Sequence, residues 1–396
     1  MEYAYKTVDI TPNKPYIIAG FIIQVEPVSK VKDKLNARIM AFKDKSTIIS
    51  ISVDSLGIDI DFQNKLENKL QQTLGKDLNL VISSTHTHFA PDIKIKEYRD
   101  FLFNTLCESI INLKWNKTSN LKYSFKKEYF DEVGKSRISN YVSKNIYLHL
   151  IKIFDNDINV INIIIYNCHP TVHLGSTDYV TSEYPGYLLK LLNEKYKDVF
   201  FTFYQSASGD ISTRFTRKSQ DYDGMIDLSN KLYKKIVELY ESNQDFNDIN
   251  KIEYKSKAIN AKHDFNEIDL SNIPNDISKR ELDTINEGVR VRNNILENPD
   301  LLTKQIKISS ISLNDLKIVF NPNELFSEYI ESLNSKKSAL VCYSNGYEPY
   351  VTPIDFKILT YETFTDTLTI ETKKEIINTI KELSSWDSSF SVLYIF

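Results

Sequence analysis

Short apolar runs alternate along the chain with segments of helical periodicity. A run of four to nine apolar residues is typical of a buried strand, whereas apolar residues spaced three or four apart form one face of a helix. In Asp61–Leu74, for example, Phe62, Leu66, Leu70 and Leu74 fall on one face. Strands are predicted at Thr47–Asp54, Leu80–Ile82, Ile146–Phe154, Val160–Cys168, Val199–Tyr204, Ile306–Leu313, Leu316–Asn321 and Ala339–Tyr343. Helices are predicted at Asp61–Leu74, Arg99–Leu113, Glu183–Lys195, Asp221–Leu239, Glu281–Leu296 and Glu371–Ser384, with another beginning near Glu324.

The order of these elements predicts an α/β fold. Strand, helix, strand and helix follow one another in residues 47–113, which favours a mixed central sheet flanked by helices. Further strands are predicted at Tyr16–Val25 and Ser391–Phe396. No internal repeat or linker divides the chain, so the interpretation is a single large domain over residues 1–396. The polar segment at about 246–300 is interpreted as a peripheral insertion, either a lid or a solvated face.

The composition indicates a globular protein with a sizeable core. The 396 residues are 41% hydrophobic and carry a formal net charge of −4, which gives no electrostatic case for binding nucleic acid. No apolar window predicts a membrane span, and the first residues lack the features of a signal peptide, so we expect a cytoplasmic protein. Cys107, Cys168 and Cys342 form no CxxC pair and are predicted to be buried free thiols.

The segment Asn79–Asp92 is the first candidate for chemistry. Its apolar run, Leu80–Ile82, is followed by small polar residues, then by His86 and His88, and then by Pro91. Side chains two residues apart on a strand point to the same face, so both rings should face a cleft at the strand end. Such a pair supplies two metal ligands, or one ligand and a proton donor. The residues alone do not choose between the two histidines, and a pair of solvated loop histidines is the alternative.

Two other predicted strands also end in polar clusters. His169 and His173 follow Val160–Cys168, and the segment Gln205–Ser212 follows Val199–Tyr204. Ligands bind beyond the carboxyl ends of strands in open α/β sheets, so we expect these clusters to converge with the first. A hydrolytic zinc site needs about three nitrogen or oxygen ligands and an open position for water. The pattern therefore predicts a metal site at the carboxyl ends of the strands. His173 could be a further ligand, but a supporting or loop position is favoured.

A carboxylate would complete such a site, and Glu324 is the candidate because it follows a strand that stops at Pro322. The alternative is an acidic residue stabilised by the dipole at a helix start. The segment Ser344–Thr352 is a further polar strand end. Asp54 and Asp210 each follow a buried strand, and either could orient a ligand histidine or have a purely structural role.

Five short motifs follow one another along the chain. They are Ser84-Thr-His-Thr-His88 with Pro91, Asn167-Cys-His-Pro-Thr171, Ser208-Gly-Asp-Ile-Ser212, Pro322-Asn-Glu324 and Asn345-Gly-Tyr-Glu-Pro-Tyr-Val-Thr352. This series resembles the catalytic domain of the neutral/alkaline, non-lysosomal ceramidase family. Asp9–Pro12, Gly20–Phe21, Leu35–Arg38 and Val53–Asp54 also fit the start of that domain, so the resemblance runs from residue 9 to about 352.

The resemblance implies an activity and a site. In that family a single zinc ion hydrolyses the amide of an N-acyl sphingoid base, which implies one Zn²⁺ per chain. The implied zinc ligands are His86, His169, Glu324 and Tyr350. The implied catalytic side chains are His88 as proton donor to the leaving amine, Ser212 beside the metal, and Tyr350 and Arg137 near the oxyanion.

The chemistry of amide hydrolysis agrees with these roles. Zinc lowers the pKa of bound water to about 7 and polarises the carbonyl. A tyrosine or arginine can share the charge of the oxyanion, and a histidine two residues from a ligand can protonate the leaving nitrogen. We therefore predict a zinc-dependent hydrolase of a small-molecule N-acyl amine. Thr213-Arg214 stands where the family has Pro-Asn, so the catalytic machinery is implied more strongly than ceramide as the substrate.

Three alternatives remain to be compared. A metallo-β-lactamase pattern requires Asp and His where this chain has Ala90 and Pro91. A serine hydrolase elbow requires Gly-x-Ser-x-Gly, which the segment Ser206–Gly209 does not match. The third alternative is a non-catalytic metal- or ligand-binding protein on the same fold, and turnover of an N-acyl substrate would exclude it.

Overall fold

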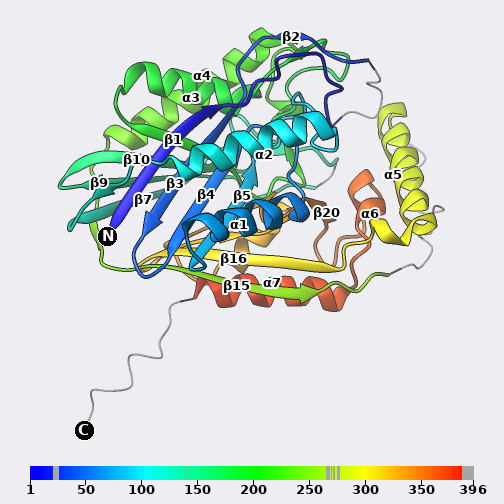
Figure 1. The fold of residues 1–396 in the computed structure, drawn as a ribbon. Coiled ribbons are helices and arrows are strands. Elements are labelled where there is room, and N and C mark those ends of the chain that lie inside the picture. Colours follow the sequence, from blue (N-terminus) through cyan, green and yellow to red (C-terminus); the bar gives the residue numbers. More distant parts are fainter. Residues whose placement is uncertain are drawn as a thin grey trace.

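The structure is a computed structural model that describes residues 1–20, 26–139, 141–264, 268, 270, 273 and 277–385. Most of its strands form three mixed sheets, with helices on their outer sides (Figure 1). The predicted α/β class with mixed sheets flanked by helices is therefore confirmed, although the strands are divided among three sheets. The predicted strand Ser391–Phe396 lies outside the described residues, as does the 21–25 part of the predicted strand Tyr16–Val25.

The first sheet has the strand order β5-β4-β3-β1-β6. Only β4 and β5 are parallel, and α1 connects them. The N-terminal end of α1 is capped by Asp59, whose carboxylate accepts a hydrogen bond from the Phe62 amide (2.8 Å). The strands are β1 Glu2–Asp9, β3 Asn36–Lys43, β4 Thr47–Val53, β5 Leu78–Ser84 and β6 Asn116–Lys117; the helices on this sheet are α1 Ile60–Leu74 and α2 Lys96–Ile111.

The second sheet has the order β12-β10-β9-β7-β14, in which β10 and β12 are parallel. On β10, Ile163 packs into the core shared with the other sheets, whereas Ile164 packs under α3 and α4. Burial on both faces explains why this strand is a continuous apolar run. The strands are β7 Leu121–Tyr129, β9 Tyr147–Asp155, β10 Ile158–Tyr166, β12 Phe200–Gln205 and β14 Asn247–Ile249; the helices are α3 Glu183–Lys195 and α4 Tyr222–Glu241.

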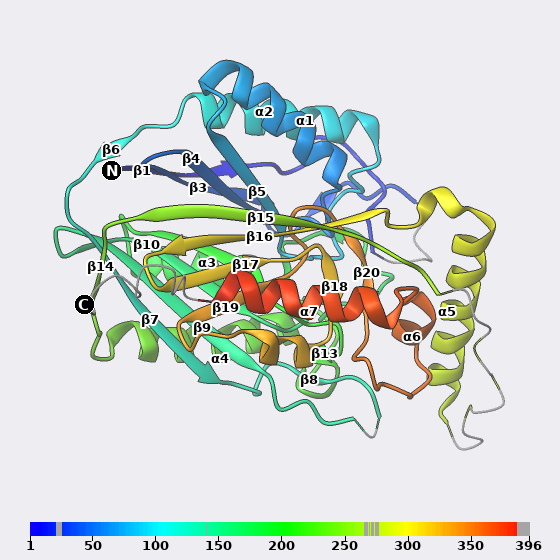
Figure 2. The ribbon, with the colours of Figure 1, turned by 90° about the horizontal axis from the view of Figure 1, so that it is seen from below.

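The third sheet has the order β15-β16-β17-β19, and α7 packs along it (Figure 2). Its strands are β15 Ile252–Asn260, β16 Gln305–Leu313, β17 Leu316–Phe320 and β19 Ser338–Val341, and its helix is α7 Ile370–Ser384. The helices α5 Lys279–Glu297 and α6 Tyr361–Thr365 pack against each other at one end of the molecule (Figure 1).

Three short strand pairs complete the described architecture. They are β2 Lys30–Val31 with β11 Tyr179–Val180, β8 Lys135–Ser136 with β13 Ile211–Ser212, and β18 Asn323–Leu325 with β20 Glu348–Val351. Short 3₁₀ turns lie at Thr213–Phe215, Pro299–Leu301 and Ser327–Ser332.

A single apolar cluster joins the three sheets. It contains Phe42 and Val81 from the first sheet, Ile163 from the second, and Ile311 and Ile318 from the third, each at most 2% exposed. Because these side chains leave water together, their burial holds the sheets against one another. Cys107, Cys168 and Cys342 are buried free thiols, as predicted. None of the described helices is both long enough and apolar enough to cross a bilayer.

Three expectations require correction. Leu74 is 43% exposed rather than buried, because it is the last residue of α1. The helix predicted to begin near Glu324 is misplaced: Glu324 lies in β18, which pairs in parallel with β20, and a 3₁₀ helix begins only at Ser327. In the 246–300 segment, β14 and β15 pair with strands of the second and third sheets, so they are integral to the fold. Among the described elements of this segment, α5 stands at the outside (Figure 2).

Candidate metal centre and active site

The ends of several strands meet at one place. The Ser84 amide, at the end of β5, donates a hydrogen bond to the Tyr343 carbonyl beyond β19 (3.0 Å). The Cys342 amide in turn donates to the Gln205 carbonyl at the end of β12 (2.9 Å). These bonds tie the three sheets together at their carboxyl ends, and the polar segments that follow the strands converge there as predicted.

His86 lies just beyond β5 and not within it. Its backbone φ is 67°, in the left-handed region that non-glycine residues rarely adopt. Its Nδ1 is 2.8 Å from the Leu56 carbonyl, and its ring stacks on Tyr343 at a centroid distance of 4.1 Å. The expectation that the two histidines share a strand face is therefore wrong. His88 still lies close, with its Nε2 3.3 Å from that of His86 and its Nδ1 3.1 Å from the Gly20 carbonyl.

His169 reaches the same point from the end of β10. Its Nδ1 is 2.7 Å from the Ser208 carbonyl, which fixes the tautomer so that Nε2 keeps its lone pair. Burial and the nearby Arg137 guanidinium lower the pKa of His169 to about 4. Burial, together with His86 and His169, also lowers the pKa of His88 well below its usual value. Both rings are therefore neutral near pH 7.

Glu324 and Tyr350 arrive from paired strands, β18 and β20, where they are cross-strand neighbours. The Tyr347 hydroxyl donates to Oε1 of Glu324 (2.7 Å), which turns Oε2 toward the histidines. Burial would raise the pKa of Glu324, but His86 and His169 hold it well below its ordinary value. Burial raises the pKa of Tyr350 despite the opposing charge of Arg137, so its hydroxyl keeps its proton.

Four atoms of this group have the spacing of metal ligands. Oε2 of Glu324 lies 3.5 Å from Nε2 of His86 and 3.1 Å from Nε2 of His169, and the Tyr350 hydroxyl lies 3.3 Å from Nε2 of His169. In a tetrahedral zinc site, ligands at bond lengths of about 2.0–2.1 Å are about 3.3 Å apart. We call His86, His169, Glu324 and Tyr350 the metal-donor cluster, and its composition and spacing fit zinc.

A second donor set overlaps with the first. The ligand atoms of His86, His88 and His169 all lie within 4.8 Å of one another, which also permits metal binding. Both sets contain His86 and His169 and differ in whether His88 is a ligand. Spacing therefore places His86 in both sets and does not decide whether His88 is a ligand.

Arg137 and Ser212 lie beside the cluster. Nη2 of Arg137 donates to the Tyr350 hydroxyl (3.0 Å) and to the Gly209 carbonyl (2.8 Å), and it forms an ion pair with Glu362 (2.6 Å). Ser212 pairs with Lys135 across β13 and β8, and it forms an isolated β-bridge with His169, which places it beside the cluster. Its hydroxyl accepts a hydrogen bond from the Arg214 amide (3.3 Å). Arg137 is therefore already oriented toward the cluster, and its charge is shared with Glu362.

The sequence did not identify three of the residues that support the site. Tyr347 and Tyr343 are two of 24 tyrosines, so composition gave them no weight. Glu362 stands in α6, far from every motif, and only the fold brings it to Arg137. Of these three residues, only Tyr347 had a signal in the sequence, which was its position three residues before Tyr350.

Two aspartates that the sequence analysis considered have supporting positions. Asp54 forms a buried two-bond ion pair with Arg38 (2.8 and 3.1 Å) and accepts from Thr85 rather than from a histidine. Asp210 accepts from the amide and the hydroxyl of Ser327 (2.6 and 2.8 Å).

His173 is paired with the fully buried Glu183, with Nδ1 2.7 Å from Oε1. This pairing holds His173 in a supporting position, one of the two that its sequence context allowed. His149 is 1% exposed on β9 and therefore belongs to the core.

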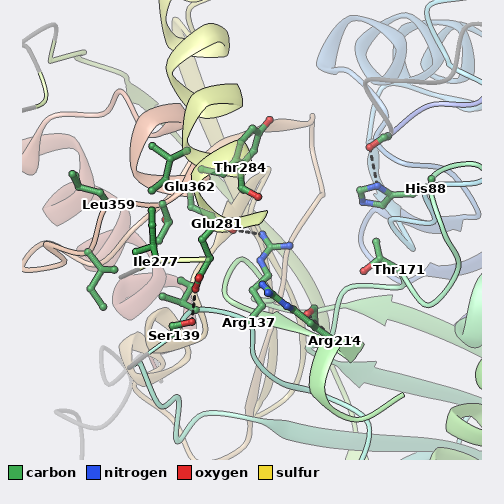
Figure 3. A pocket seen from close by; sticks show the side chains of 18 of the residues that line it. His88, Arg137, Ser139, Thr171, Arg214, Ile277, Glu281, Thr284, Leu359 and Glu362 are labelled. Atoms are coloured by element: carbon green, nitrogen blue, oxygen red, sulfur yellow. Dashed lines mark hydrogen bonds and ion pairs between the residues drawn. The ribbon is translucent and has the colours of Figure 1, made fainter. Parts of the chain in front are cut away.

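A cavity of about 660 Å³ lies next to the metal-donor cluster, because two of its lining residues, His88 and Arg137, contact that cluster. His88, Arg137 and Ser212 line it, so three of the four side chains with implied catalytic roles share one space. Figure 3 shows His88 and Arg137 in this cavity. One side is formed by residues before and within α5 and before and within α6, which we call the helical wall. The lining residues of the helical wall are Ile277, Glu281, Thr284, Ile285, Lys357, Ile358, Leu359, Thr360, Tyr361 and Glu362.

Comparison with known proteins identifies the fold. No family model matches the chain, and no curated protein matches its sequence. Among solved structures, neutral ceramidase from Pseudomonas aeruginosa superimposes with a TM-score of 0.75 at 11% identity, and a ceramidase complexed with C2 superimposes with a TM-score of 0.73 at 11% identity. Each match covers 97% of this chain and 74% of the other. The chain therefore has the ceramidase fold; at this identity the likeness concerns architecture and not activity.

Proposed function

We propose that this protein is a zinc-dependent amide hydrolase that removes the acyl group from an N-acyl amine. The observation that carries the proposal is the metal-donor cluster, in which donor atoms from separate segments lie 3.1–3.5 Å apart, next to the cavity that His88 and Arg137 line. The ceramidase fold supports the proposal, because the similar solved structures are of ceramidases. The amide bond itself is the shared substrate feature, and the substrate need not be ceramide.

The metal would be held by His86, His169, Glu324 and Tyr350. A zinc ion bound there supplies an activated water and polarises the acyl carbonyl. The carbonyl contacts to Nδ1 of His86 and of His169 fix both rings in orientation, so little reorganisation is needed for binding. Tyr347 orients Glu324 in the same way.

The remaining residues would transfer a proton to the leaving nitrogen and stabilise the negative charge that develops on the carbonyl oxygen. His88 is neutral and faces the cavity, so it can take up a proton at Nε2 and deliver it to the leaving nitrogen. The Tyr350 hydroxyl, held by Arg137, can donate to the oxygen that becomes negative. Ser212 lines the cavity and can position the substrate.

The test is metal content followed by turnover. Protein purified without chelator or histidine tag should contain about one zinc per chain, and it should release fatty acid from an N-acyl amine panel. His86→Ala and Glu324→Ala should lose zinc and at least about 1,000-fold in kcat/KM, with unchanged circular dichroism. His263→Gln is the matched control, because His263 bonds Thr303 and Thr367 away from the site. Full activity in the first two variants would refute the proposal.

One observation favours the alternative of a non-catalytic binding protein. The Arg137–Glu362 ion pair partly neutralises the charge that an oxyanion would need. The alternative predicts that the protein binds zinc and N-acyl ligands but never turns them over. Release of fatty acid that depends on Glu324 would exclude it.

A further inference from the structure

Arg137 lines the cavity and also contacts the metal-donor cluster. Its Nη2 donates to the Tyr350 hydroxyl (3.0 Å) and to the Gly209 carbonyl (2.8 Å). Its Nε is buried and has no hydrogen-bond partner among the described residues. A guanidinium carries five N–H donors, and a buried donor that lacks an acceptor is unfavourable. The side chain therefore has a donor left for an oxygen atom of a ligand.

Glu362 offsets much of the charge of this guanidinium. Oε1 of Glu362 lies 2.6 Å from Nη2 of Arg137 (Figure 3). Both residues line the cavity, and the side chains of Glu362 and Arg137 are 7% and 21% exposed. Partial removal from water strengthens the attraction between the two charges. Arg137 thus presents hydrogen-bond donors to the cavity with little net charge.

The packing of α6 sets the position of the Glu362 carboxylate. This helix contacts both α5 and β20. At Gly288 of α5 the approach is so close that an added Cβ would lie 3.0 Å from Cβ of Phe364 and 3.1 Å from Cα of Tyr361. Glu362 itself is 6% exposed. An anion that binds to Arg137 therefore lies close to a second carboxylate that is fixed by the fold.

The substrate and the product of amide hydrolysis differ in charge. The acyl carbonyl of an N-acyl amine is neutral, whereas the acid that is formed ionises to a carboxylate near neutral pH. A guanidinium paired with a carboxylate can still donate to a neutral carbonyl, but its partner repels an ionised acid. The same repulsion acts on the oxyanion only in the transition state, whereas the acid has to leave after every turnover.

We propose that Glu362 is a specificity-determining residue that lowers the affinity of the site for carboxylates, so that neutral N-acyl amines bind and the acid that they yield is released. This inference rests on the proposed function and extends it to the product. The sign of the effect separates this role from a structural one. Loss of a structural contact loosens the site and weakens the binding of every ligand, whereas loss of a counter-ion tightens the binding of an anion alone.

The test measures the binding of an acid and of its uncharged amide. Zinc-loaded full-length protein, as wild type and as Glu362→Gln, is titrated by calorimetry with laurate and with lauramide. We expect laurate to bind about 10-fold more tightly to the variant, and the affinity for lauramide to change less than about twofold. The other charged residues of the cavity are the same in both proteins, so the difference reports Glu362. Unchanged or weaker laurate binding in the variant, or no laurate binding to either protein, overturns the inference.

Three further variants assign the effect to this ion pair. Glu362→Asp keeps the charge and should bind laurate as weakly as the wild type. Arg137→Gln should weaken laurate binding about 10-fold, which is the opposite direction to Glu362→Gln. Glu371→Gln is the matched control, because Glu371 is the second residue of α7, as Glu362 is of α6, but is exposed. Weaker laurate binding in both Glu362→Gln and Arg137→Gln would show that the ion pair is only structural.

Failure of the proposed function gives a different result, because the calorimetric comparison needs no turnover. If the N-acyl amine panel is hydrolysed, laurate should inhibit Glu362→Gln at about 10-fold lower concentration than it inhibits the wild type. If no member of the panel is hydrolysed, the hydrolase proposal fails, and tighter laurate binding in Glu362→Gln still supports discrimination against carboxylates at this cavity. Absence of that tightening overturns the inference in either case.

Discussion

The helical wall lines the cavity and the metal-donor cluster lies next to it, and the two are held in different ways. His86, His169 and Glu324 are at most 4% exposed, and main-chain carbonyls or a tyrosine fix the orientation of each. In the helical wall, Thr284 and Lys357 are exposed, and α5 packs chiefly against the short helix α6. The difference indicates that the sheets hold the donor atoms of the cluster, whereas the helical wall is held mainly by contacts between α5 and α6, with Glu362 joining it to Arg137.

The largest expected effect separates the two possible roles of His88. If His88 is the proton donor, His88→Ala should keep about one zinc per chain and lose about 100- to 10,000-fold in kcat. The comparison is His86→Ala, which should lose the metal. Zinc content by elemental analysis decides the question. Loss of zinc in His88→Ala would make His88 a ligand and favour the three-histidine donor set.

The next effect tests whether the cluster depends on close backbone packing. A Cβ added to Gly209 would lie 2.8 Å from the Glu324 carbonyl oxygen and 2.9 Å from that of Leu325. Gly209→Ala should therefore lower the free energy of unfolding by about 1–3 kcal/mol and reduce zinc affinity, as measured by urea unfolding and metal titration.

Gly75→Ala is the control for this substitution, because no atom lies within 4 Å of its Cβ and only its φ of +116° is strained. It should cost about 1 kcal/mol and leave zinc binding intact. Equal zinc affinity in the two alanine variants would show that the cluster tolerates movement of the Glu324 backbone.

A smaller effect concerns pH and Asp210, which supports the segment after Glu324. Burial raises the pKa of Asp210 to about 6, although bonds from Ser327 oppose the shift. Between about pH 4 and 6 the folded protein then holds a proton that the unfolded chain has released, so stability falls as pH rises through this window. Asp210→Asn should remove about 2 kcal/mol of that fall, seen in urea unfolding from pH 4 to 7. An identical pH slope in both proteins would contradict this account.

The smallest effect tests whether the helical wall can be destabilised without changing the metal-donor cluster. Ser278 caps α5 by accepting from the Glu281 amide, and Glu281 accepts in return from Ser278. Ser278→Ala should cost about 1 kcal/mol locally and speed amide exchange in α5, with zinc content unchanged. Thr369→Ala, at the equivalent cap of α7, should leave exchange in α5 unaltered. A loss of zinc in Ser278→Ala would show that the wall and the cluster are coupled.

Much of the fold could be predicted because its signals are local. Buried strands such as Val160–Cys168 are continuous apolar runs, and α1 has both a capping aspartate and a helical apolar face. The segment after Pro322 was mispredicted because a helix start and a short parallel strand have similar sequences when the partner strand is not known. That partner strand, β20, lies some twenty residues further along. The division of strands among three sheets was also out of reach, since pairing is a long-range property.

The amino-acid sequence by itself determined which residue types stand at the ends of the buried strands, because apolar periodicity and strand termination are local. It did not determine which donor atoms face one another. The left-handed backbone of His86, the bonds that orient His169 and Glu324, and the pairing of Arg137 with Glu362 arise only where separate sheets and α6 meet. The tertiary structure decided the geometry of the site, because distances of 3.1–3.5 Å between side chains from separate segments depend on the packing of the whole core.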